Sequence, residues 1–142
     1  MKIEKKVLNI LKKGVLRAYK RNEVPVCAVI LNNKGKVISI GINNRQKNYD
    51  VLGHAEVIAI RKAERKLKDW RLDGFSMIVT LEPCNMCSSI INECRLDKVY
   101  YFLSKNELNE QDSLQNILCL NGYEEEKKYF KNLLTGFFNN KR

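Results

Sequence analysis

The sequence predicts one α/β domain in which strands alternate with helices and the later strands run parallel to one another. The length of 142 residues fits a single domain that covers residues 1–142. Short apolar runs alternate with longer segments of helical periodicity, and no internal repeat, linker or low-complexity stretch interrupts them. Parallel neighbours need a long crossover, usually a helix, so this order favours a mixed sheet in a layered architecture.

The first third of the chain predicts a helix followed by a β-hairpin. From Ile3 to about Tyr19, apolar residues recur at helical spacing with lysines between them, which is typical of an amphipathic helix. A continuous apolar run then covers residues 26–31 and predicts a strand. Residues 32–35, Asn-Asn-Lys-Gly, supply a turn, and residues 36–42 are expected to return as the second strand.

The middle of the chain predicts two strand-to-helix units. An irregular stretch ends at Gly53, and residues 54–67 then carry the spacing of a second helix. Residues 75–81 follow as a buried strand. Pro83 fits the first turn of a third helix that runs towards Cys94, because proline lacks the N–H that this turn does not use.

The end of the chain predicts one more strand and a last helix. Residues 98–103 are expected to form the next strand of the sheet. The final helix is indicated by an apolar stripe made of Tyr129, Leu133, Leu134, Phe137 and Phe138. It ends in the basic segment 139–142, Asn-Asn-Lys-Arg.

Composition argues against a membrane protein and in favour of a polyanionic partner. No apolar run approaches the roughly 18 residues of a membrane span, and residues 1–7 lack the separate apolar stretch of an export signal. We therefore expect no membrane association. The formal charge of +10 is large for this length and favours a polyanionic partner such as nucleic acid, although solvated basic faces with no partner produce the same excess.

The cysteines indicate metal ligation and a reducing compartment. Their number, five, is odd, and Cys84 and Cys87 follow a proline with the spacing of a metal site rather than of a disulfide framework. We therefore expect a cytoplasmic protein. Cys27, Cys94 and Cys119 lie in apolar surroundings, where a free cysteine usually acts as a small buried hydrophobe.

Two helix starts carry the residues that predict chemistry. Cys84 and Cys87 lie on one face of a helix whose N-terminus favours thiolates, so both can bind one ion. His54, the only histidine, lies near the start of the preceding helix. Two adjacent strands would bring the two helix starts together. Two cysteines and one histidine leave the fourth tetrahedral position of zinc to water, as in catalytic sites.

Glu56 is the predicted proton carrier of this site. It follows His54 by two residues, about 200° around a helix, and is therefore poorly placed to bind the same ion. It is able instead to exchange protons with the nucleophilic water and the substrate. The structural alternatives are a hydrogen-bonded core role for His54 and a helix-capping or ion-paired role for Glu56.

These motifs together resemble a known family. The pair formed by residues 54–56, His-Ala-Glu, and residues 83–87, Pro-Cys-Asn-Met-Cys, is the signature of the cytidine deaminase superfamily. Within it, the chain is most similar to bacterial tRNA-specific adenosine deaminases. Residues 22–29 resemble the Glu-Val-Pro-Val strand entry of these enzymes, residues 42–45 their Asn-x-Arg segment, and Phe137-Phe138 their C-terminal helix.

The resemblance implies a three-layer α/β/α cytidine deaminase-like fold with a mixed central sheet of four to five strands. The stretch from Ser113 to Phe138 is shorter than in the family, so the fifth strand is expected to be short or absent. The resemblance also implies one zinc ion per chain, held by His54, Cys84 and Cys87.

The implied reaction is hydrolytic deamination of adenosine to inosine at the wobble position of the tRNA anticodon stem-loop. By resemblance, Glu56 shuttles protons, Asn43 hydrogen-bonds the purine and the Ala55 backbone amide faces the base. Homodimers are typical of the family. RNA contacts are expected from the end of the chain, at Phe137, Phe138, Lys141 and Arg142.

Three departures from the family pattern leave the metal motifs intact. Cys27 replaces a glycine, Val51-Leu52-Gly53 stands where Pro-Thr-Ala is usual, and residues 104–112 lack the usual Gly/Ala-rich loop. Two alternatives stay open. One is a guanine or cytosine deaminase of the same superfamily, and the other is a non-catalytic zinc-stabilised RNA-binding module in which Cys27 or Cys94 closes the fourth metal position.

Overall fold

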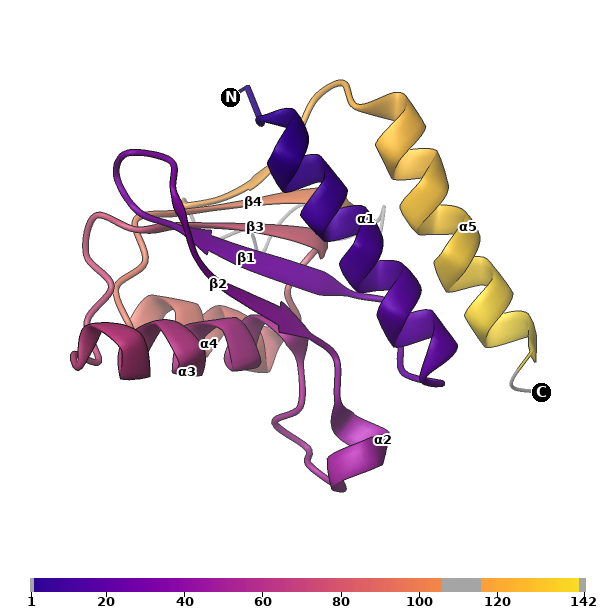
Figure 1. Cartoon of the computed structure of the whole chain (residues 1–142), viewed down its shortest axis with the longest axis horizontal. Coiled ribbons are helices and arrows are strands. Elements are labelled where there is room, and N and C mark those ends of the chain that lie inside the picture. The colour runs from indigo at the N-terminus through magenta and orange to yellow at the C-terminus, as the bar shows by residue number, and fades with distance from the viewer. Residues whose placement is uncertain (1, 106–115, 141–142) are drawn as a thin grey trace.

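The computed structural model describes residues 2–105 and 116–140, which form a five-stranded sheet between two layers of helices (Figure 1). The strands are β1 (Cys27–Leu31), β2 (Val37–Ile42), β3 (Ser76–Leu81), β4 (Lys98–Leu103) and β5 (Ile117–Cys119). The helices are α1 (Lys5–Lys20), α2 (Arg45–Asn48), α3 (Ala55–Leu67), α4 (Asn85–Glu93) and α5 (Glu124–Asn140). This is the three-layer α/β/α architecture that the resemblance implied.

The sheet is mixed, with strand order β2-β1-β3-β4-β5. Strand β1 pairs antiparallel with both β2 and β3, which confirms the predicted hairpin. Strands β3, β4 and β5 run parallel, as expected for strands that are joined through helices. The fifth strand, which was expected to be short or absent, is present and only 3 residues long.

The route by which the two predicted helix starts meet differs from the expectation. Helix α3 follows β2 and helix α4 follows β3, but these strands are not adjacent, because β1 lies between them. Since β1 is antiparallel to both, β2 and β3 run in the same direction and end at the same edge of the sheet. The helix starts therefore meet across one intervening strand.

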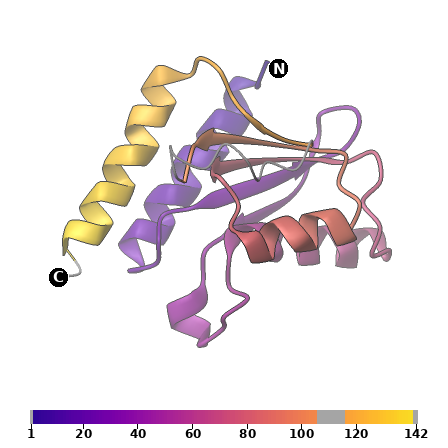
Figure 2. The ribbon, with the colours of Figure 1, turned by 180° about the vertical axis from the view of Figure 1, so that it is seen from behind.

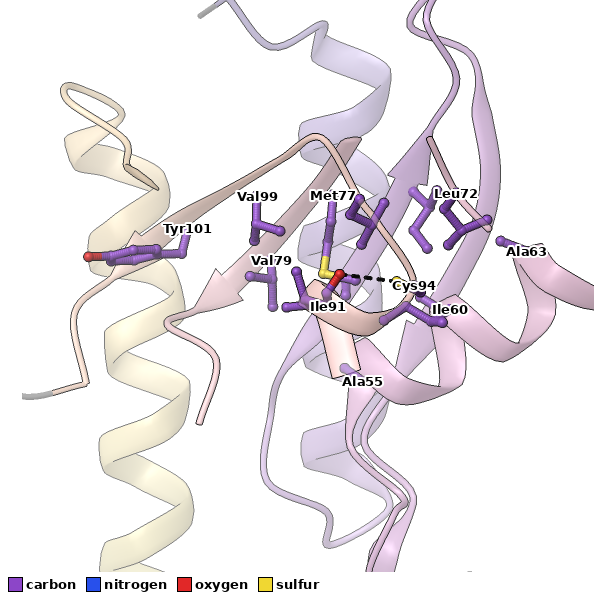
Figure 3. Close-up of a cluster of buried hydrophobic side chains, with 14 of the residues drawn as sticks. Ala55, Ile60, Ala63, Leu72, Met77, Val79, Ile91, Cys94, Val99 and Tyr101 are labelled. Atoms are coloured by element: carbon purple, nitrogen blue, oxygen red, sulfur yellow. Dashed lines mark hydrogen bonds between the residues drawn. The ribbon is translucent and has the colours of Figure 1, made fainter. Parts of the chain in front are cut away.

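The two faces of the sheet bury different side chains. Helices α3 and α4 cover one face, and α1 and α5 cover the other (Figures 1 and 2). Along β1, Ala28 and Ile30 pack in the cluster with α3 and α4, whereas Val29 and Leu31 pack in the cluster with α1 and α5. This alternation is the period of a strand that is buried on both sides. Figure 3 shows the first cluster, to which Ala55 from α3, Ile91 from α4 and Val79 from β3 belong.

The departure at Cys27 has a structural counterpart in α1. Cys27 is buried on β1, and a Cβ added to Gly14 of α1 would collide with the Cys27 side chain. The larger residue on the strand is thus accommodated by the missing side chain on the helix. Burial raises the pKa of the Cys27 thiol to about 12, which keeps it protonated and unreactive, as expected of a small buried hydrophobe.

Three local expectations are corrected. Cys119 is exposed rather than buried, because it lies on the short edge strand β5. Pro83 does not lie in the first helical turn: Cys84 is the N-cap and α4 begins at Asn85. The segment expected to be irregular before Gly53 contains the single-turn helix α2. Among the described residues, no helix is long and apolar enough to cross a membrane.

Candidate metal centre and active site

His54, Cys84 and Cys87 converge at the edge of the sheet where β2 and β3 end. Their ligand atoms all lie within 4.8 Å of one another. The Nδ1 atom of His54 is 3.7 Å from the Cys84 Sγ and 3.4 Å from the Cys87 Sγ. His54 and Cys84 are the N-caps of α3 and α4, and Cys87 lies in the first turn of α4. The structure thus brings together the three predicted ligands.

The close approach of α3 to the sheet positions His54. Gly41 of β2 faces the first turns of α3, where an added Cβ would collide with the Ala55 carbonyl oxygen and lie 2.6 Å from the Ala59 nitrogen. No side chain fits between the strand and the helix at this point. The loop from β2 to α3 is closed by a hydrogen bond of 2.7 Å from the Asn44 N–H to the Gly53 carbonyl, directly before His54.

The donor set suits zinc. Two thiol sulfurs and one imidazole nitrogen are ligands that zinc prefers, and three protein ligands leave one position open. Among the described residues, the ligand cluster contains neither Cys27 nor Cys94. Cys94 points elsewhere, with its thiol donating to the Ile91 carbonyl. The described chain therefore gives no support to a closed site in which one of these two cysteines is the fourth ligand.

Local electrostatics also favour a cation. Burial, followed by the charges of Glu56 and Cys84, raises the pKa of the Cys87 thiol. A bound dication reverses this effect and stabilises the thiolate. Burial, followed by the charges of Arg45 and Lys105, lowers the pKa of His54 and keeps its imidazole neutral, the form that binds metal.

Glu56 lies in the first turn of α3 and is only 4% exposed. Burial raises the pKa of its carboxyl to about 7, opposed by a backbone hydrogen bond, a hydrogen bond with the Cys87 side chain and the charge of Lys105. The Glu56 carboxyl therefore contacts Cys87 but is not a member of the metal-binding group formed by His54, Cys84 and Cys87. A pKa near neutrality lets one group accept and return a proton, which suits general acid–base catalysis.

Asn43 is buried next to the cluster, and its Oδ1 accepts a hydrogen bond of 2.7 Å from the Ala55 N–H. The Ala55 amide, which is predicted to face the base, thus donates to the side chain of Asn43, the other residue predicted to contact the base. The physical reason is that the first amides of a helix lack intrahelical partners, and the Asn43 side chain supplies one. Asn43 is thereby held with its oxygen towards α3, which leaves its amide N–H groups for other partners.

Glu23 is a site-supporting residue whose function the sequence analysis missed. Its side chain is 2% exposed and its two oxygens accept hydrogen bonds from the Gln46 and Lys47 amides, at 3.1 and 3.0 Å. The carboxylate therefore stabilises the N-terminus of α2 and anchors the loop between Asn43 and His54. The only sequence signal was the position of Glu23 in the segment that resembles the family's strand entry.

Two of the four predicted RNA contacts lie apart from the cluster. Phe137 and Phe138 are on α5, which covers the face of the sheet opposite to α3 and α4 (Figure 2). Their rings form an edge-to-face pair at 5.3 Å, and Phe138 is 56% exposed. Lys141 and Arg142 lie outside the described residues, and of the 104–112 loop only residues 104 and 105 are described.

The chain is similar in sequence to known zinc-binding deaminases. The family described as the cytidine and deoxycytidylate deaminase zinc-binding region matches residues 1–103. A tRNA-specific adenosine deaminase of Rickettsia bellii is 41% identical over 91 residues, which cover 63% of each protein. A tRNA-specific adenosine deaminase of Buchnera aphidicola is 32% identical over 142 residues, which cover 95% of this chain and 93% of that protein.

Two solved structures support the same context. A structure from a study of A-to-I editing by tRNA:A34 deaminases has a TM-score of 0.76 and 27% identity, and the match covers 92% of this chain and 100% of that one. A guanine deaminase from Bacillus subtilis has a TM-score of 0.65 and 31% identity, and covers 71% of this chain and 65% of that one.

Proposed function

Because this chain belongs to the cytidine and deoxycytidylate deaminase zinc-binding family, we propose that it converts adenosine to inosine at the wobble position of tRNA. The observation that carries the proposal is the convergence of His54, Cys84 and Cys87 beside the buried carboxyl of Glu56. In the reaction, water replaces the amino group at purine C6, and ammonia leaves.

The preference for tRNA over a free base rests on sequence identity and charge. The Buchnera tRNA-specific adenosine deaminase is 32% identical over a match that covers 95% of this chain, whereas a guanine deaminase structure from Nitrosomonas europaea covers 92% of this chain at 16% identity, a likeness that shows the fold alone. The net charge of +10 also suits a polyanion better than a neutral base. These two observations favour an RNA substrate.

The metal-binding residues are assigned from the donor set. His54, Cys84 and Cys87 would hold one zinc ion per chain. When bound there, zinc lowers the pKa of a water molecule and so supplies a nucleophile at neutral pH. The thiol of Cys87, buried between Cys84 and Glu56, becomes a thiolate ligand when the ion is present.

Glu56 moves the protons of the reaction. Its carboxylate accepts a proton from the attacking water and passes it to the purine ring nitrogen, and a second transfer leads to the leaving amine. Asn43 orients the base through its amide N–H groups, because its Oδ1 is already occupied by the Ala55 amide. Ala55 is then a positioning residue for Asn43.

The proposal includes a homodimer and a cytoplasmic location. An apolar groove of about 430 Å³ runs between α3 and α4 and is lined by Val57, Ile90 and Trp70, and the last of these is 55% exposed. A second copy of the chain, docked on this groove, would bury it close to the metal cluster. The five free thiols and a tRNA substrate both fit a reducing cytoplasm.

Conversion of a panel of purified tRNAs tests the proposal. Zinc-loaded protein is expected to form inosine at the wobble position of at least one tRNA with adenosine there. The same preparation should leave free guanine and free cytosine unchanged. Turnover of either free base, with every tRNA left untouched, would replace this function with the small-base alternative.

A further inference from the structure

A second concave site lies at the outer edge of the sheet, behind the loop that carries Asn43. It is a pocket of about 330 Å³ between the C-terminal end of α1, the end of β2, the loop after it and α3. Figure 1 shows α1 and α3 on either side of β2, with α2 beyond the end of this strand. Five cationic residues line the pocket and are here called the β2-edge patch: Arg17, Arg21, Arg61, Lys62 and Arg65.

The charge of the β2-edge patch is not neutralised. All five side chains are on exposed residues, and Asp50 is the one acidic residue among those that line the pocket. In the described part of the chain, the ion pairs join Lys6 to Glu4 and Arg71 to Asp69, so none involves the patch. Five cations around one concave surface create a strongly positive potential that attracts an anion.

The free edge of β2 is closed to a strand from another chain. Lys62 donates to the Ile40 carbonyl at 3.1 Å, and Lys66 donates to the Ile38 carbonyl at 3.5 Å. Lysine side chains at the carbonyls of an edge strand block strand addition. The occupant suggested by this edge is therefore a polyanion that contacts side chains, rather than a polypeptide that pairs with the strand.

The pocket is physically connected to the active-site loop. Asn44 and Gly53 line it, and they directly adjoin Asn43 and His54 in the sequence.

We propose that the β2-edge patch binds the phosphate backbone of the RNA whose adenosine enters the active site. The inference rests on the proposed function and extends it to a named substrate-binding surface. Arginine is suited to this contact because its planar guanidinium donates two hydrogen bonds to one phosphate. Phosphate contacts of this kind fix the position of an RNA without reading its sequence.

The test neutralises three arginines and measures how RNA binding depends on salt. The variant is Arg17→Gln, Arg21→Gln and Arg65→Gln. Arg61 is left intact because it also lines the α3–α4 groove, and Lys62 because it caps a β2 carbonyl. The probe is an anticodon stem-loop with adenosine at the wobble position, bound to zinc-loaded protein.

The matched control removes the same charge from the opposite end of the strands, where β2 and β4 begin. Lys34 and Lys36 lie at the β1–β2 turn and Lys98 begins β4, and all three are exposed. The control variant is Lys34→Gln, Lys36→Gln and Lys98→Gln. Both variants have a net charge that is lower by 3 than the wild-type +10, so a general charge effect would change them equally.

For the β2-edge variant, the slope of log affinity against log salt should flatten by about 2 to 3, with about 100-fold weaker binding at 0.1 M salt. Zinc content and inosine formation at saturating RNA should remain at the wild-type level. The control should keep the wild-type slope. Equal slopes for the two variants, or a wild-type protein that does not bind the stem-loop, would overturn the proposal.

The outcomes separate this inference from the proposed function. Inosine formation with equal salt slopes would keep the function and remove the β2-edge patch as an RNA site. A flattened slope without inosine on any tRNA would keep the patch and remove the proposed reaction. If the triple variant does not fold, the single variants Arg17→Gln and Arg21→Gln should each flatten the slope by about 1, and unchanged slopes in both would overturn the proposal.

Discussion

Gly41→Ala is expected to destabilise the protein and weaken zinc binding through a single methyl group. The added Cβ would collide with the Ala55 carbonyl oxygen and lie 2.6 Å from the Ala59 nitrogen, against about 3.4 Å for an ordinary contact. Both obstacles are backbone atoms of α3, so no side-chain rotation relieves the collision. Helix α3 would have to move away from β2 by about 1 Å. Overpacking of this kind lowers the free energy of unfolding by about 1–3 kcal/mol. Because the obstacle here is backbone, we expect the upper end of this range.

The same movement should disturb the metal cluster. His54 is the N-cap of α3 and moves with the helix, whereas Cys84 and Cys87 are carried by α4. A ligand displaced relative to its partners no longer matches the short, fixed bond lengths of zinc. We expect zinc affinity to fall by about 10- to 100-fold, the range seen when groups that orient metal ligands are altered.

Gly136→Ala is the matched control, because it makes the same chemical change where space is available. Gly136 lies within α5, and an added Cβ would be 3.5 Å from the Tyr19 Oη, an ordinary contact. This variant should gain about 0.5–1 kcal/mol, since alanine is the better helix former.

Urea unfolding of metal-free protein and competition with a chromophoric zinc chelator measure the two quantities. The unfolding free energy should fall for Gly41→Ala and rise for Gly136→Ala. An unfolding free energy for Gly41→Ala within 0.5 kcal/mol of wild type, with unchanged zinc affinity, would refute the steric reasoning, because it would show that β2 and α3 separate at no cost.

Four further predictions address the site and its support. Glu56→Gln should retain zinc and lower single-turnover inosine formation by about 10⁴-fold or more, and activity within tenfold of wild type would contradict its role in proton transfer. Cys87→Ser should abolish stoichiometric zinc in metal analysis, together with the zinc-dependent rise in melting temperature. Glu23→Ala should lower the unfolding free energy by about 1–3 kcal/mol, because two α2 amides lose their acceptor, whereas Glu23→Gln should lose less. Deleting residues 139–142 should flatten the salt slope of tRNA binding by about 1 per lost phosphate contact, and an unchanged slope would mean that this segment makes none.

The sequence alone predicted most of the elements and the three residues that the structure brings together as a metal-binding group, but not helix α2. Apolar periodicity is a local property, and it predicted the α3 and β4 segments to within one residue of the structure. The zinc ligands were also predictable, because Cys84 and Cys87 share one helical turn and His54 is the only histidine of the chain. The resemblance predicted a short or absent fifth strand, because the chain before the last helix is shorter than in the family.

Only the tertiary structure decided which elements and groups became neighbours. Strand β1 lies between β2 and β3 because it pairs with both, and pairing between segments distant in the chain leaves no local pattern. The Ala55 amide took Asn43 as its acceptor for a similar reason, since an unsatisfied helix N-terminus accepts whichever oxygen the fold brings near. The β2-edge patch likewise joins cations from α1 and α3 that are separated in the sequence and meet only because both helices flank the same strand.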